Sequence, residues 1–284
     1  MAEASTGPLG PDAIDVHGAD SAEAELRPGR LDMSLAGRSS RPRGALHPLT
    51  QIVREISDIF SRMGFSAIQS PEIETERDNF EALNIPADHR TREAHNAFFI
   101  RPPDARAMKA LVLRTHTAPM QIRSLQSRGV PVRVISAGRV FRRQEGLTKA
   151  SMFHRIEGLV VDEGISMVHL KGVLSSVVNA MLGGRAVRFR PHYFPFVVPG
   201  IEVDIECIFC GRGGCVVCEQ TGWLTVVGAG MVHPVILSDC GVDSERFTGF
   251  SFGVGLDRLA MLRWQIADLA ILFQSDARFL SPHS

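Results

Sequence analysis

The sequence predicts an α/β fold in which helices flank an antiparallel sheet, and three patterns lead to this expectation. Apolar residues recur along 132–142 and again along 152–161, as in two strands that a polar loop joins into a hairpin. Apolar residues at helical spacing predict helices over 48–63 and 164–181. A glycine-rich strand that leads into a helix is expected over 249–262.

Composition and charge set broad limits on function. The chain has 284 residues, of which 44% are hydrophobic and 22% charged, a profile typical of a globular protein with an ample core. Its 31 lysines and arginines balance 31 aspartates and glutamates, so any RNA contact must be local or made by a partner. Because the sequence has no membrane-spanning apolar run and no signal peptide, we expect no membrane contact and a cytoplasmic protein.

The chain divides at about residue 45. Residues 1–45 are rich in Ala, Gly, Ser, Asp, Arg and Pro without sustained periodicity, and we expect a mostly disordered leader there. Residues 46–284 are expected to form one domain. Its first helix is predicted to be followed by a short strand over 65–71.

The segments between these landmarks carry further expectations. Residues 79–101 are interpreted as a loop, and 105–127 as a passage from a strand into a helix. Strands are predicted over 186–198 and 223–227, the second of them ending before a glycine-rich stretch.

Four of the five cysteines lie in two CxxC pairs, separated by a glycine-rich spacer. Two such pairs at the ends of a tight turn can supply four thiolates to one tetrahedral zinc ion, and this favours a structural zinc site over free thiols. The predicted ligands of this knuckle, 207–218, are Cys207, Cys210, Cys215 and Cys218. Cys240 stands alone and is expected to be a buried apolar residue.

The hairpin carries residue types that suit a nucleotide. Arg142 ends the first strand, Lys149 lies in the loop and Phe153 lies on the returning strand. Cations neutralise phosphate oxygens and an aromatic ring can stack on a base. A solvated charged hairpin remains the alternative. His116 lies where a strand passes into a helix, either as a ligand-facing side chain or as a structural histidine.

An ordered set of short sequence words gives these residues a context. Together they resemble the class II aminoacyl-tRNA synthetases, specifically the catalytic α subunits of phenylalanyl-tRNA synthetases, from about residue 31 to residue 280. The arrangement of Arg142, Lys149, Phe153 and Glu157 resembles motif 2 of that class, and the word that contains Arg258 resembles motif 3. The words, in order, are HPLT, NFEALNIPADH, LRTHT, GRVFR, MFHRIEGLVV, LKG, RFRPHYFPF, GAGMVHP and GFSFGVGLDRLAMLR.

The resemblance implies a class II fold, a reaction and roles for residues. In the implied reaction, ATP activates phenylalanine as an acyl-adenylate and the acyl group passes to tRNA. Arg142 would bridge the acid and the α-phosphate, Arg258 would bind the γ-phosphate, Phe153 would stack on adenine and Lys149 would add a cation. The implied acid-binding residues are His116, Ala118, Gln121, Gln144, Arg155, Glu157, Phe194, Phe196 and Ser251.

The resemblance also implies partners and ions. It implies a β subunit, tRNA, Mg²⁺ with the ATP, and dimerisation through the region Pro48 to Pro71. Thr225 replaces an acidic residue expected to help bind Mg²⁺, so that site is expected to be weakened.

Several positions depart from the family pattern. Gln144 replaces an acid, Ala118 a serine, Arg155 a glutamine and Ser251 an alanine. An arginine at 155 would repel an ammonium group and attract a carboxylate or phosphate.

Three hypotheses are therefore open. The chain is a synthetase α-type subunit, or a stand-alone enzyme that adenylates another carboxylic or amino acid for a carrier, amine or thiol, or a non-catalytic binding paralogue.

Overall fold

A computed structural model of the chain describes residues 45–93, 96–100, 110–143, 150–266, 268–274 and 276–280. The leader predicted over 1–45 lies outside this part of the chain except for its last residue. Gln144 and Lys149, two of the predicted site residues, also lie outside it. These three expectations stay predictions.

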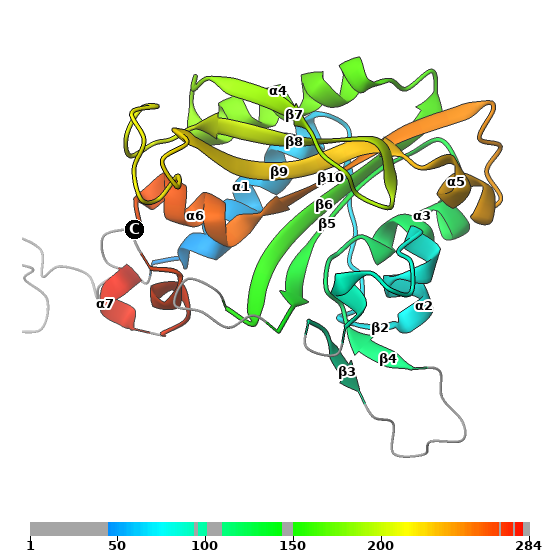
Figure 1. The fold of residues 1–284 in the computed structure, drawn as a ribbon, viewed down its shortest axis with the longest axis horizontal. Coiled ribbons are helices and arrows are strands. Elements are labelled where there is room, and N and C mark those ends of the chain that lie inside the picture. The colour runs from blue at the N-terminus through cyan, green and yellow to red at the C-terminus, as the bar shows by residue number, and fades with distance from the viewer. Residues whose placement is uncertain are drawn as a thin grey trace, which may run out of the picture. The chain divides into compact units, whose positions relative to one another are not determined.

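A seven-stranded sheet forms the centre of the domain, and Figure 1 shows its long strands side by side. All neighbouring strands are antiparallel except β1 and β5, which are parallel. In spatial order the strands are β1 (Ser66–Ala67), β5 (Val132–Phe141), β6 (Met152–Glu163), β10 (Phe247–Gly255), β9 (Trp223–Val232), β8 (Val197–Glu206) and β7 (Val187–Pro191). The predicted antiparallel sheet is confirmed.

The predicted hairpin is β5 and β6. Its register runs without interruption from Val132 opposite Val161 to Phe141 opposite Met152. Side chains on β6 alternate between the two faces of the sheet. Ile156 therefore packs into one apolar cluster while Leu159 packs into the other.

Helices cover both faces of the sheet. The first cluster includes side chains of α1 (Pro48–Arg62), α4 (Met167–Leu182) and α6 (Leu256–Trp264). The second includes side chains of α3 (Pro119–Arg128) and α5 (Pro234–Asp239). The predicted helices are present. Figure 1 shows α5 and α6 at opposite ends of the sheet, as expected for helices that follow the antiparallel strands β9 and β10.

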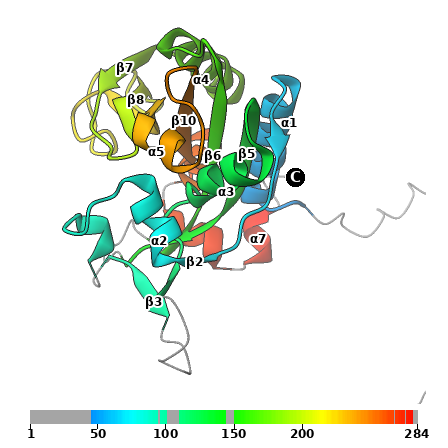
Figure 2. The same ribbon diagram turned by 90° about the vertical axis from the view of Figure 1, so that its right-hand side faces the viewer.

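The expectation of a loop over 79–101 is wrong. Within this region β3 (Phe98–Ile100) joins a second, three-stranded sheet with two strands from outside it, in the order β2 (Ile73–Thr75), β4 (Leu111–Leu113) and β3. Figure 2 shows β3 projecting away from the large sheet. Strands of three residues are too short to show a period, so the pattern missed β2 and β3. β4 and α3 form the passage from a strand into a helix predicted over 105–127. The other short helices are α2 (Glu76–Asn79), η1 (Glu81–Leu83), η2 (Arg90–Arg92), η3 (Leu269–Phe273) and α7 (Ala277–Leu280).

The expectation of a single strand over 186–198 is also wrong. The chain turns between β7 and β8, where the backbone N–H of His192 donates to the carbonyl oxygen of Gly200 at 3.0 Å. Phe194 and Phe196 lie in this turn, and the proline between them has no N–H to donate to a ladder. The close return requires glycine, because a Cβ at Gly200 would lie 2.4 Å from the His192 carbonyl oxygen.

The strand predicted over 223–227 is longer than expected. β9 continues through the glycine-rich stretch to Val232. Glycine is tolerated there because the neighbouring chain comes close, and a Cβ at Gly230 would lie 2.6 Å from the carbonyl oxygen of Pro199. In the part of the chain that the structure describes, no helix combines the length and apolarity needed to cross a bilayer.

Candidate active site

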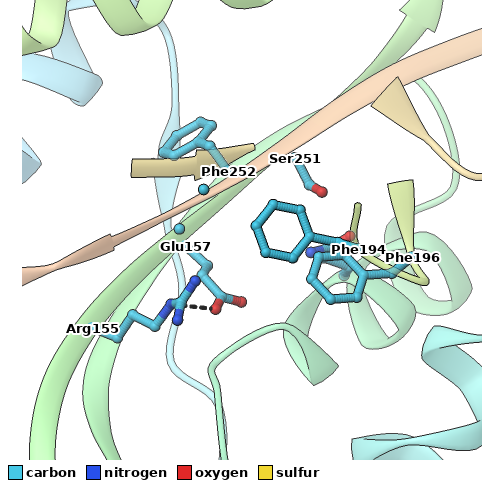
Figure 3. A pocket seen from close by; sticks show the side chains of 9 residues that line it. Arg155, Glu157, Phe194, Phe196, Ser251 and Phe252 are labelled. Carbon is cyan, nitrogen blue, oxygen red and sulfur yellow. Dashed lines mark ion pairs between the residues drawn. The ribbon is translucent and has the colours of Figure 1, made fainter. Parts of the chain in front are cut away.

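A pocket of about 270 Å³ opens on the face of the sheet opposite α1 and α4, and Figure 3 shows it from close by. Three strands (β6, β9 and β10), one turn and one helix contribute to its wall. The lining residues are Gln121, Arg155, Glu157, Phe194, Phe196, Gly228, Ser251, Phe252 and Gly253.

Strand β6 supplies three of the predicted site residues from one face. Phe153, Arg155 and Glu157 are two residues apart, so their side chains point to the same side of the sheet. On the neighbouring strand β10, Gly253 lies opposite Glu157. The alternation of β6 therefore places an aromatic ring, a cation and a carboxylate in a row.

The apolar wall of the pocket comes from the turn between β7 and β8. The rings of Phe194 and Phe196 stack with centroids 5.6 Å apart and planes 24° apart. Gly228 on β9 leaves room for them, since a Cβ there would lie 3.0 Å from Cζ of Phe194. Ser251, on β10, is buried in the wall. This wall suits a flat aromatic side chain.

The polar wall is an ion pair between Arg155 and Glu157. Their Nε and Oε1 atoms are 2.8 Å apart, and Figure 3 shows the pair facing the two phenylalanine rings. Gly253 lets the guanidinium lie against the sheet, because a Cβ there would come within 2.4 Å of Nη2 of Arg155. Oε2 of Glu157 is buried without a hydrogen-bond partner. Burial raises the pKa of Glu157, against the opposing effect of the Arg155 and Arg142 charges.

Three further predicted residues lie in the segment between β4 and α3 or in the first turn of α3. His116 is buried, both its ring nitrogens lack hydrogen-bond partners, and its ring lies edge-on to Phe196 with centroids 6.4 Å apart. Oε1 of Gln121 is buried and unpartnered in the pocket. Ala118, at the start of α3, is buried and offers no side-chain polar group. Burial, followed by the charges of Arg142 and Arg155, lowers the pKa of His116 to about 3.

This pKa predicts a pH dependence of stability. Because the folded-state pKa of His116 is below the ordinary value of 6.5, the unfolded chain binds the extra proton between these values. We expect the unfolding free energy to fall by roughly 3–5 kcal/mol from this residue as the pH drops from 6.5 towards 3. Urea unfolding at several pH values should show the slope, and H116N should flatten it. An equal slope in both proteins would contradict the assignment.

Arg142 and Phe153, two of the predicted nucleotide-binding residues, meet at one end of the sheet. Nε of Arg142 donates to the carbonyl oxygen of Thr115 at 2.8 Å, and its guanidinium carbon lies 5.4 Å from the centre of the Phe153 ring. Burial and the nearby Arg155 lower the pKa of Arg142 to about 10, which leaves it charged at neutral pH. Arg142 is thus held beside the ring predicted to stack on adenine.

Arg258 lies at the same end, on the first turn of α6. Its side chain is exposed, and Nη1 donates to the carbonyl oxygen of Thr225 at 3.1 Å. An exposed arginine beside the Arg142 and Phe153 end of the sheet is placed to reach a phosphate.

The residues around Thr225 do not fit a magnesium site. Oγ1 of Thr225 donates to Asp204 at 2.7 Å, and Nε of Arg188 and of Arg190 donate to the same carboxylate at 2.9 and 3.4 Å. Burial acts to raise the pKa of Asp204, but these hydrogen bonds outweigh it and lower the pKa. Three donors therefore occupy the carboxylate of Asp204, and we assign no Mg²⁺ to it.

The four cysteines of the predicted knuckle lie together at the turn between β8 and β9. Their Sγ atoms all lie within 4.8 Å of one another, and three of the separations are 3.6, 3.7 and 3.8 Å. Sulfur ligands at about 2.3 Å from a tetrahedral zinc ion would be about 3.8 Å apart, whereas a disulfide needs about 2.05 Å. The donor set therefore fits a metal ion. The fifth cysteine, Cys240, is half-buried beside the second apolar cluster rather than fully buried as expected.

The structure and the sequence place the chain in a known class. The chain superposes on the crystal structure of pyrrolysyl-tRNA synthetase from Desulfitobacterium hafniense with a TM-score of 0.59 and 17% identity, covering 80% of this chain and 74% of that one. This likeness concerns the fold. The family model described as tRNA synthetases class II core domain (F) matches residues 30–283. The chain belongs to the family of class II tRNA synthetase core domains.

More similar relatives define a narrower group. The chain is 46% identical over 264 residues to the phenylalanine–tRNA ligase alpha subunit of Saccharophagus degradans, covering 93% of this chain and 76% of that protein. It is 49% identical to the subunit of that name from Dehalococcoides mccartyi, covering 88% of this chain and 72% of that one. The particular proteins that this chain resembles are thus phenylalanine–tRNA ligase alpha subunits.

Three features of the site were not predicted from the sequence. Gly228 and Gly253 admit the Phe194 ring and the Arg155 guanidinium, and Asp204 accepts the hydrogen bond of Thr225. The sequence shows two glycines and an acidic residue in or beside strand-like stretches, and this was the signal that could have pointed to them. Only the register between strands shows which side chains these residues face.

Proposed function

We propose that this chain is an ATP-dependent ligase that activates phenylalanine as an adenylate and transfers it to tRNA. The observation that carries the proposal is the row of Phe153, Arg155 and Glu157 along β6, with an aromatic pocket at one end and Arg142 at the other. The names of the relatives supply the acid and the acceptor. The carboxylate of the acid would lie between the pocket and the nucleotide.

The proposed reaction proceeds in two displacements. A carboxylate oxygen attacks the α-phosphorus of ATP, the bond to the bridging oxygen breaks, and pyrophosphate leaves with the bonding electron pair. Arg142 stabilises the negative charge that builds on the α-phosphate, and Arg258 orients the terminal phosphate. A tRNA hydroxyl then attacks the acyl carbon, loses its proton, and AMP leaves. Mg²⁺ would enter with ATP rather than on a protein carboxylate at Thr225.

The proposed assembly includes a β subunit and a second copy of the chain. The chain spans about three quarters of the relatives that it matches, whose shared name makes them alpha subunits. For the dimer, we propose the region Pro48 to Pro71, because β1 lies at an edge of the large sheet and Ile73 just beyond it is half exposed. An unpaired strand edge favours association with another chain.

For the cysteine knuckle we propose one structural zinc ion. Support comes from the sulfur separations and from Cys218, whose thiol is buried yet accepts hydrogen bonds from the N–H groups of Cys215 and Gly222, both at 3.2 Å. These bonds outweigh burial and lower the pKa of Cys218 to about 6, which favours the thiolate that metals require. Reduced thiols fit a cytoplasmic location.

ATP–pyrophosphate exchange tests the proposed function. The purified chain, alone and with a co-expressed β subunit, should incorporate labelled pyrophosphate into ATP when Mg²⁺ and an aromatic acid are present. Exchange should depend on the acid, because no adenylate forms without it. Absence of exchange with every aromatic acid, with and without the β subunit, would refute the proposal and favour a binding paralogue.

A further inference from the structure

The charge of the acid pocket does not suit an ammonium group. Among the described residues that line it, Arg155 and Glu157 are the two charged side chains, and they neutralise each other across 2.8 Å. An amino acid brings an α-ammonium that needs an anion or several acceptors when water is excluded. The available carboxylate, Glu157, already has a cation beside its Oε1. Its Oε2 has no hydrogen-bond partner, but an ammonium group bound there would share one carboxylate with the guanidinium of Arg155.

Arg155 is held in this position. Its side chain is 22% exposed, and its guanidinium occupies the space that a side chain at Gly253 would fill. A second cation, Arg142, lies close enough for the charge of Arg155 to lower its pKa. An ammonium group at this end of the pocket would therefore meet two like charges at low dielectric, which is unfavourable.

Neutral polar groups are better accommodated. Oε1 of Gln121 is a buried acceptor without a partner in the same pocket, and His116 next to Phe196 is uncharged with two free ring nitrogens. A hydroxyl group can donate to one such acceptor and accept from a ring N–H or a guanidinium. The two stacked phenylalanine rings bind an aromatic side chain whether or not the neighbouring carbon carries nitrogen.

We propose that this pocket accepts aromatic carboxylic acids that lack an α-ammonium group, α-hydroxy acids above all, and that Arg155 sets this selectivity. The proposal rests on the adenylation proposed above and extends its acids from phenylalanine to aromatic acids without an α-ammonium group, which the pocket should use at least as well. The chemical step is unchanged, since the carboxylate oxygen attacks the α-phosphorus and pyrophosphate leaves.

The test compares acids within one protein. We would measure kcat/KM for ATP–pyrophosphate exchange with 3-phenyllactate, 3-phenylpropionate and phenylalanine, using the full chain with its β subunit if exchange requires one. In the unaltered protein, 3-phenyllactate should be used at least as well as phenylalanine. In R155Q the ratio should shift towards phenylalanine by roughly 10- to 100-fold, because Glu157 loses its cation and can pair with the ammonium.

Two matched variants separate the effect of the Arg155 charge from the effect of its side-chain shape and from a general loss of activity. R155K keeps the positive charge, so its ratio should stay near that of the unaltered protein. R246Q removes an exposed arginine that pairs with Glu163 at the far end of the same strand, and its ratio should not change.

The outcomes distinguish the two proposals. Exchange with none of the three acids refutes the proposed adenylation itself. Exchange with phenylalanine more than about tenfold better than with 3-phenyllactate in the unaltered protein overturns the selectivity proposal alone, even if R155Q does not fold. An unchanged ratio in a folded R155Q protein overturns it too.

Discussion

Replacing Arg142 with alanine should lower kcat/KM for ATP–pyrophosphate exchange by about two to three orders of magnitude. Arg142 is the charged group fixed at the junction of the pocket and the nucleotide end, by Thr115 on one side and the Phe153 ring on the other. Its guanidinium is the hydrogen-bond donor best placed to stabilise the negative charge that builds on the α-phosphate. The effect should fall mainly on kcat, because the donor matters most in the transition state.

Arg139 provides the matched control for this prediction. It lies on β5, three residues before Arg142, but is exposed, and it pairs with Glu72 at 2.8 Å. An exposed pair contributes little, so R139A should retain exchange and stability. If R142A kept more than a tenth of the activity, or if R139A lost as much, Arg142 would not be the group that stabilises the transferring phosphate.

Replacing Cys218 with serine should release the proposed zinc ion. We expect about one equivalent of zinc per chain in the unaltered protein and almost none in C218S, because a tetrahedral structural site needs its four ligands. The midpoint of thermal unfolding should fall by about 5 °C or more, since metal binding contributes to folding free energy. Metal analysis by mass spectrometry and calorimetry would measure the two effects.

Cys240 offers the control within the same chain. Its side chain lies beside the second apolar cluster, away from the knuckle. C240S should keep the full zinc content. An unaltered protein purified without metal, whose stability does not respond to added zinc, would contradict the proposed site.

Much of the architecture could be predicted because its elements are long. The helix at Pro48 and the hairpin of β5 and β6 each run for ten residues or more, long enough for their apolar periods to be distinct. The four cysteines were recognisable because thiolate pairs at that spacing have few other uses. The predicted role of Arg142 came from the ordered sequence words rather than from periodicity.

The features that could not be predicted from the sequence depend on contacts between segments that are distant along the chain. The turn around Phe194 follows from a hydrogen bond between His192 and Gly200, and no local pattern encodes that approach. The pairing of Arg155 with Glu157 could be expected from their spacing on a strand, but the place of the guanidinium depends on Gly253 from another strand. The sequence thus predicted which residue types form the site, but not how neighbouring strands restrict the positions of their side chains.

Because side chains alternate along β6, this strand fixes the distances between the residues that contact the ligands. Residues two apart on a strand are separated by about 6.7 Å, so this one strand sets the distance from the ring expected to stack on the base to the residues that face the acid. A one-residue insertion or deletion in β6 before Phe153 or within the row would turn side chains from the ligand face into the core beneath α1 and α4. A change in which acid the pocket recognises must therefore come from substitution of individual residues, as at Arg155. The spacing between the acid-binding residues and the nucleotide then stays constant.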